Sequence, residues 1–108
     1  MNAWKQLTIH ISEADRWQHQ PLYQEVLGIA RQQGVAGVTV VQAIAGYGKQ
    51  GVFRTTNLLD PSSESSALPL LMTVIDREEN IAEFLASAQE MLEGKVIICQ
   101  TVEVLQGF

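Results

Sequence analysis

Four stretches of the chain have the hydrophobic pattern of β-strands. Apolar and polar residues alternate over 7–11, which is the period of a half-buried strand. β-Branched and other apolar residues dominate 37–45, 68–76 and 95–105, and each run is bounded by glycine or by polar residues. We expect a strand at each of the four stretches.

Two segments between these strands have apolar residues at helical spacing. The first follows Pro21, whose missing N–H is tolerated in the first turn of a helix, and it closes at Gly34, a residue favoured at helix C-termini. The second follows Asp76 and Glu79, which have the spacing of a capping box, and it ends at Gly94.

The predicted element order is β-α-β-β-α-β, which is typical of an α+β fold of the ferredoxin-like type. This fold has a four-stranded antiparallel sheet with two helices on one face. We expect residues 1–108 to form a single domain. The connection over about 46–67 is far longer than a hairpin needs, and loops of that length are usually functional or disordered.

The sheet face away from the helices is predicted to be apolar too. We expect it to carry Leu71, Ile75, Ile97 and Cys99 beside Thr8, His10 and Thr73. An apolar second face is normally covered, and no third layer is predicted within this chain. We therefore expect copies of the chain to associate into a closed ring.

Composition narrows the class of protein without indicating a function. The chain is 46% hydrophobic with a net charge of −5, which argues against nucleic acid as a partner. Its single cysteine fits a reducing cytoplasm, and no stretch approaches the ~18 apolar residues of a membrane helix. Cys99 and the two histidines have no recognised ligand spacing, so we expect no metal site.

The segment GYGKQG, residues 46–51, is the most informative motif. Glycines let backbone N–H groups approach an anion, and Lys49 adds positive charge, although the same pattern also suits a plain turn. Arg54 could clamp an anion or pair with a loop acid. Lys95 follows Gly94 at a predicted strand start, where a solvated lysine is the alternative interpretation.

A second polar cluster, Glu13, Asp15 and Arg16, follows the first strand beside Trp17. Paired carboxylates with an arginine could perform acid–base chemistry. A loop with an internal ion pair and an aromatic lid is the simpler interpretation. His10 is expected to point outward from the first strand.

The stretch 37–51, GVTVVQAIAGYGKQG, resembles the second strand and signalling-loop base of PII signal-transduction proteins. Those proteins are ferredoxin-like trimers that bind adenine nucleotides between subunits. Over about 5–105 the chain is still more similar to an uncharacterised PII-like family, sometimes encoded near CrcB-type fluoride exporters. LTIHISEADRW, the helix start at Pro21, and RTTNLL carry that similarity.

The sequence departs from PII proteins at phosphate-binding positions. Gly51 stands where PII proteins have a lysine, the second phosphate loop is reduced to Gly94 and Lys95, and no arginine follows Arg77. The resemblance therefore implies a small anionic effector, such as an adenine nucleotide, more readily than an ATP and 2-oxoglutarate switch. The implied ligand-binding residues are Gly46, Gly48, Lys49, Gly51, Arg54, Gly94 and Lys95.

Three functional hypotheses follow. The first is a cytoplasmic homotrimer without enzymatic activity, which binds its effector at intersubunit clefts and signals through residues 46–67 to a partner such as a membrane transporter. The resemblance also gives Glu13, Asp15 and Arg16 a role in the cleft or at the trimer contact. The alternative is a small isomerase or decarboxylase using Glu13, Asp15 or His10. A cation-tolerance trimer of the same fold is disfavoured by the sparse His and Cys.

Overall fold

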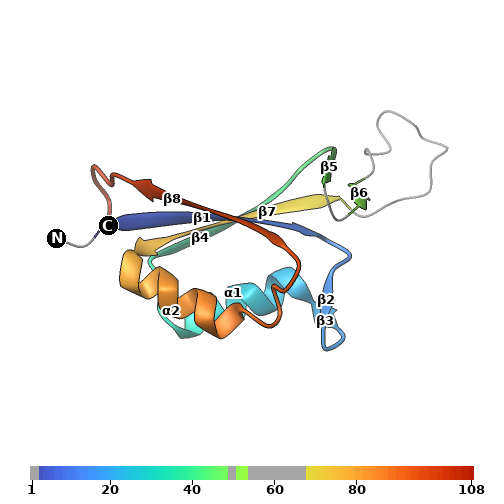
Figure 1. Cartoon of the computed structure of the whole chain (residues 1–108), viewed down its shortest axis with the longest axis horizontal. Helices are drawn as coiled ribbons and strands as arrows, with labels where there is room; N and C mark the ends of the chain where they lie inside the picture. The colour runs from blue at the N-terminus through green and yellow to red at the C-terminus, as the bar shows by residue number, and fades with distance from the viewer. Residues whose placement is uncertain (1–2, 49–50, 54–67) are drawn as a thin grey trace.

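A computed structural model describes residues 3–48, 51–53 and 68–108, and of residues 51–53 only the backbone. Its main sheet has the strand order β4-β7-β1-β8 with antiparallel neighbours, and α1 and α2 cover one face (Figure 1). The main elements are β1 Trp4–Ser12, α1 Leu22–Gln32, β4 Gly37–Gln42, β7 Pro69–Arg77, α2 Glu78–Ala88 and β8 Val96–Val102. The ferredoxin-like fold expected from the sequence is confirmed.

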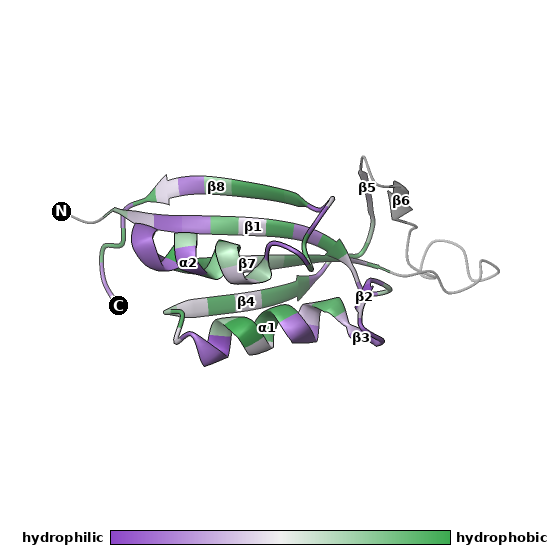
Figure 2. Cartoon of the chain, turned by 60° about the horizontal axis from the view of Figure 1, so that its bottom comes forward, coloured by the Kyte–Doolittle hydropathy of each residue, from purple (hydrophilic) through white to green (hydrophobic). Residues whose placement is uncertain are grey.

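The core lies between the sheet and the two helices. Alternate residues of β1 and β7 point into it, and Leu7, Ile9 and Met72 are fully buried there opposite Phe84 of α2. Burying each such side chain contributes about 1.5–3 kcal/mol. Figure 2 shows mostly hydrophobic strands and an α1 that alternates between hydrophobic and hydrophilic residues along its length. Among the described residues, no helix is long and apolar enough to cross a membrane.

The ends of α1 follow from local backbone chemistry. Pro21 lies just before the helix and not in its first turn, and the N–H of Leu22 donates to the carbonyl of Asp15 at 2.9 Å. At the other end, Gly34 has the expected left-handed conformation, with φ +70°. Its N–H donates to the carbonyl of Arg31 at 3.1 Å, which closes the last turn.

The predicted capping box of α2 is wrong. Arg77 is the N-cap, and no side chain makes a capping hydrogen bond there. Asp76 lies one residue earlier and is buried at the end of β7. The helix ends at Ala88, before the predicted boundary, and turns lead on to Gly94, where φ is +80°.

A short hairpin that the sequence analysis did not predict joins β1 to α1. Its strands are β2 Arg16–Trp17 and β3 Gln20–Pro21. The two turn residues, Gln18 and His19, have φ of 51° and 71°. Both are therefore in the left-handed region, as in a type I′ turn, although neither is the glycine or asparagine that such turns favour.

The open face is the face of the sheet away from the helices. On β8, the prediction for this face was wrong by one position. Ile97 pairs with Ile9, and Cys99 pairs with Leu7, so both lie on the helix-covered side of the sheet. Val96 and Ile98 take their places on the open face. The residues over the central part of this face are Gly37, Thr39, Val41, Leu71, Thr73, Ile75, Gln6, Thr8, His10, Val96, Ile98 and Gln100. These residues are half apolar and half polar, so the face is less apolar than expected.

The C-terminal segment returns to the end of the sheet where β1 begins (Figure 1). The ring of Phe108 stacks on Trp4 with centroids 5.3 Å apart, and the Arg77 guanidinium lies 5.6 Å from the Trp4 ring centroid. A Cβ on Gly37 would meet Cγ2 of Ile75 at 3.0 Å and Cζ of Phe108 at 3.2 Å. A side chain at position 37 would therefore require Ile75 and the ring of Phe108 to move by a few tenths of an ångström.

Candidate functional site at one end of the sheet

The antiparallel topology brings both predicted clusters to the same end of the sheet. β1 and β4 finish at this end, and β7 and β8 begin there. Backbone hydrogen bonds fix the connecting segments here: the N–H of Glu13 donates to the carbonyl of Leu68 at 3.0 Å, and that of Ala43 donates to the carbonyl of Pro69 at 2.8 Å. β8 is antiparallel to β1, so residues after β1 lie beside the start of β8 at this end.

Asp15 and Lys95 form an ion pair across this end. Lys95 Nζ lies 3.1 Å from Asp15 Oδ1, and the two side chains are 21% and 24% exposed. The second carboxylate oxygen of Asp15 accepts a hydrogen bond from the N–H of Ser12 at 2.8 Å. Asp15 is thus held by its own loop, and its cationic partner is Lys95 and not a residue of the same cluster.

Glu13 has a different role. Its Oε2 accepts a hydrogen bond from Nε2 of Gln42 at 2.6 Å, which links the loop after β1 to the last residue of β4. Trp17 is half-buried against the core, as expected of an aromatic lid, and Arg16 is exposed on β2. In this cluster, Glu13 and Asp15 therefore bind other parts of the chain, and Arg16 is an exposed cation.

The GYGKQG segment contains a second hairpin. β5 Gly46–Gly48 pairs with β6 Gly51–Phe53 in antiparallel register, with Gly48 opposite Gly51. Lys49 and Arg54 lie outside the described residues. Gly46 is extended, and a Cβ there would make only an ordinary 3.4 Å contact with Pro69. Neither backbone conformation nor crowding explains glycine at position 46.

Glycine at position 94 has a structural explanation. Its φ of +80° disfavours any residue with a side chain, and the following N–H, that of Lys95, donates to the carbonyl of Leu92 at 3.0 Å. Gly94 thus turns the chain into β8 and sets the starting point of the Lys95 side chain.

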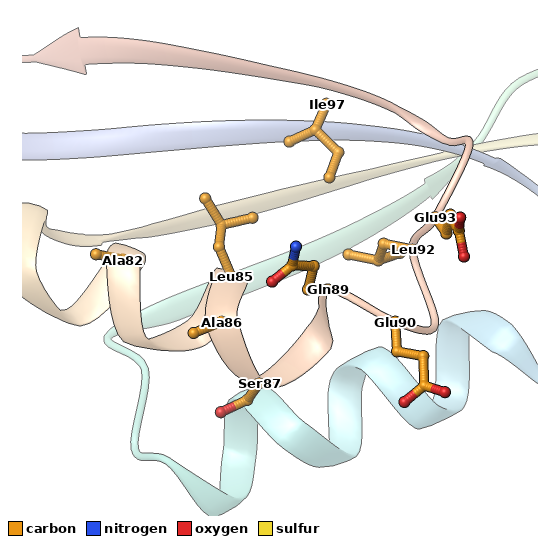
Figure 3. Close-up of a pocket in the computed structure, with 9 residues that line it drawn as sticks. All are labelled: Ala82, Leu85, Ala86, Ser87, Gln89, Glu90, Leu92, Glu93 and Ile97. Carbon is orange, nitrogen blue, oxygen red and sulfur yellow. The ribbon is translucent and has the colours of Figure 1, made fainter.

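Two grooves among the described residues lie along the sheet edges. One, of about 920 Å³, lies between α2 and β8, with an apolar floor that includes Leu85 and Ile97, and with Glu90 and Glu93 on its lining (Figure 3). The other, of about 480 Å³, lies between α1 and β4 and includes Arg31. Among the described residues that line these two grooves, none belongs to the predicted sites.

The residues of the enzymatic alternative do not share a pocket. His10 lies half-buried on the open face, between its strand partners Leu71 and Val96. Glu13 and Asp15 follow the end of the same strand and are occupied by Gln42 and Lys95. Among the described residues, no group of three or more His, Cys, Asp or Glu could hold a metal ion.

Among the described carboxyl groups, Asp76, at the opposite end of the sheet, has a displaced pKa. Burial raises its pKa, but hydrogen bonds from Asn80 and from the N–H groups of Arg77 and Ala36, with the charge of Arg77, outweigh burial and lower the pKa below its ordinary value. The sequence analysis treated Asp76 only as a helix cap. A lone carboxylate continuing the buried alternation of β7 was the signal for a tertiary role.

Known proteins are similar to this chain over nearly its whole length. A UPF0166 protein from Aquifex aeolicus is 38% identical over 104 residues, which cover 94% of this chain and 92% of that protein. The UPF0166 protein MJ1524 from Methanocaldococcus jannaschii is 31% identical over 97 residues, with coverage of 90% and 86%.

Among solved structures, this chain is similar to CPII, a nitrogen regulatory PII-like protein from Thiomonas intermedia K12, bound to ADP, AMP and bicarbonate. The TM-score is 0.67 at 22% identity, with 95% of this chain and 89% of that one covered. At this identity the likeness shows the fold, which is PII-like, as the sequence suggested. The family model DUF190, described as "Uncharacterized ACR, COG1993", matches residues 4–104, and the chain therefore belongs to the DUF190 family.

Proposed function

We propose that this chain is a PII-like regulatory protein that forms a cytoplasmic homotrimer and binds a small anionic effector, such as an adenine nucleotide, at clefts between subunits. The observation that carries the proposal is the meeting of Lys95, the Asp15 loop and the β4–β5 connection at one end of a PII-like fold. The similar CPII structure contains ADP, AMP and bicarbonate, which indicates the class of ligand to test.

Assembly is supported by surfaces that one copy leaves uncovered. Val41 is 50% exposed and Ile98 is 47% exposed on the open face, although both are large and apolar. β4 and β8 are edge strands, each flanked by a groove. The β8 groove carries Glu90 and Glu93 and the β4 groove carries Arg31, so the two edges carry opposite charges where neighbouring copies would meet in a closed ring.

The proposed ligand site combines the cation at the start of β8 with the glycine hairpin, which is the hairpin formed by β5 and β6. Lys95 supplies positive charge, and Gly46, Gly48 and Gly51 let the backbone approach an anion without a side chain in the way. Lys49 and Arg54 belong to the same proposal by sequence. The site is assigned to a cleft between copies because Lys95 lies near the sheet edge formed by β8, where a neighbouring copy can approach it.

A binding role is favoured over catalysis by how the polar groups are used. Glu13 and Asp15 are engaged as structural acceptors, and His10 lies on the face that assembly would cover. In the proposal, effector binding at the cleft is communicated through residues 46–67 to a protein partner such as a membrane transporter.

The test combines mass and binding measurements. Light scattering after size exclusion should give the mass of three chains, and calorimetric titration should show binding of at least one of AMP, ADP, ATP, a cyclic nucleotide or bicarbonate. Lys95→Gln should weaken that binding by about tenfold, as loss of a charge-assisted hydrogen bond predicts. Lys5→Gln is the matched control, because Lys5 bonds Thr101 at the other end of β1. A monomer, or a trimer that binds none of these compounds, would refute the proposal.

A further inference from the structure

The ion pair between Asp15 and Lys95 has a geometry suited to exchange. Lys95 Nζ lies 3.1 Å from one carboxylate oxygen, and each side chain keeps roughly a quarter of its surface in solvent. Partly exposed ion pairs of this kind are weakly held, because water screens them and a long lysine chain loses freedom in forming them. The pair can therefore open without stranding a charge in a dry interior.

The two partners differ in how firmly they are held. Asp15 stays fixed by its own loop, because its other oxygen accepts the N–H of Ser12 at 2.8 Å and its carbonyl accepts the N–H of Leu22 at 2.9 Å. Lys95 is a point charge on four rotatable methylenes. When the pair opens, it is the ammonium group that moves and the carboxylate that keeps its hydrogen bond.

A carboxylate and a phosphate oxygen are alternative acceptors for the same ammonium group. In the closed pair the charge of Lys95 is neutralised, so an approaching anion meets a carboxylate as well as a cation. A ligand with one negative charge gains little by replacing the Asp15 carboxylate. A ligand with two or more negative charges on neighbouring oxygens gains from the exchange.

We propose that Asp15 is a built-in competitor for Lys95, which sets the affinity of the site for anions and favours multiply charged phosphate and polyphosphate ligands over singly charged anions. This inference rests on the proposed function, because it takes Lys95 as part of the effector site. Asp15 is then a specificity-determining residue that acts on the ligand through Lys95.

The decisive variant is Asp15→Asn, which keeps an oxygen for the Ser12 N–H and removes only the charge. Titration with ADP and with inorganic pyrophosphate should show binding about tenfold tighter than in the unmodified protein. Glu83→Gln, the same charge change on an exposed residue of α2, should change affinity less than twofold. In the Lys95→Gln background, Asp15→Asn should give no gain, because the gain requires the freed lysine.

The outcomes separate this inference from the nucleotide proposal. If pyrophosphate gains affinity in Asp15→Asn while no nucleotide binds, the inference holds and the nucleotide proposal fails. Weaker ADP binding in an Asp15→Asn variant with unaltered circular dichroism would mean that Asp15 positions Lys95. Unchanged binding would mean that Asp15 has no effect on the site, and either result overturns the inference. Bicarbonate binding that depends on Lys95 and is as tight as pyrophosphate binding in the unmodified protein also overturns it, and failure of both probes in both proteins overturns both proposals.

Discussion

The carboxylate of Asp76 accepts a hydrogen bond from the backbone N–H of Ala36 at 2.9 Å, across 40 residues of sequence. Its other oxygen accepts the N–H of Arg77 at 2.6 Å and Nδ2 of Asn80 at 3.0 Å. One buried side chain thus joins the end of β7, the first turn of α2 and the connection between α1 and β4. Three donors would lose their acceptor if it were removed.

Asp76→Ala is therefore expected to lower the free energy of unfolding by about 2 kcal/mol, because it leaves three partly buried donors without their acceptor. Asp76→Asn keeps one acceptor oxygen and should cost less. Urea unfolding at a fixed protein concentration measures both, and Glu83→Ala on the exposed side of α2 is the control, with an expected change below about 0.5 kcal/mol. A loss for Asp76→Ala as small as that of the control would contradict the structural role.

The pH dependence of stability has a definite sign at Asp76. Its pKa is lower in the folded protein than in the unfolded chain, so the unfolded chain binds the proton more readily. The stabilisation is complete above the ordinary aspartate pKa and is lost as the pH falls through the folded value. The difference in stability between the unmodified protein and Asp76→Asn should thus shrink from pH 7 toward about pH 3. A constant difference across that range would show that the charge of Asp76 contributes nothing.

The main elements were predictable because their patterns are unambiguous. The alternation at 7–11 determines which face of β1 is buried. β8 offered no such guide, since Val96, Ile97 and Ile98 are all apolar and either phase fits. Only the pairing of Ile97 with Ile9 decides it, and that is a tertiary fact.

The candidate site was predictable as two separate clusters but not as one place. Asp15 and Lys95 are remote in sequence, and only the antiparallel order of β1 and β8 makes them neighbours. Local spacing favoured an ion pair within the loop after β1. The partner of Asp15 in the structure is Lys95, which lies too far away in the sequence for spacing to indicate it. The glycine hairpin was predicted as a turn or an anion-binding segment, and the anion-binding role stays a prediction.

The turn between β2 and β3 is predicted to store strain. Gln18 and His19 both have positive φ, where a Cβ is unfavourable by about 1 kcal/mol or more for each residue. His19→Gly should therefore raise the free energy of unfolding by about 0.5–1 kcal/mol after the greater freedom of glycine in the unfolded chain is counted. His19→Ala removes the imidazole but keeps the Cβ, so it should give no gain. Equal stabilisation by both variants would mean that the imidazole, and not the backbone, is the source of strain.

Ile98→Glu tests whether the open face is where copies meet. Ile98 is 47% exposed beside Thr8 on that face, so glutamate can be solvated in a single copy but would be buried in an assembly. Burial of an unpaired carboxylate is strongly unfavourable, so the assembly should be weakened. The variant should therefore sediment and elute as a smaller species. Gln32→Glu adds the same charge at the exposed end of α1 and should keep the original mass. If Ile98→Glu also keeps that mass with unchanged circular dichroism, the open face is not the contact, and the edge grooves beside β4 and β8 become the surfaces to vary next.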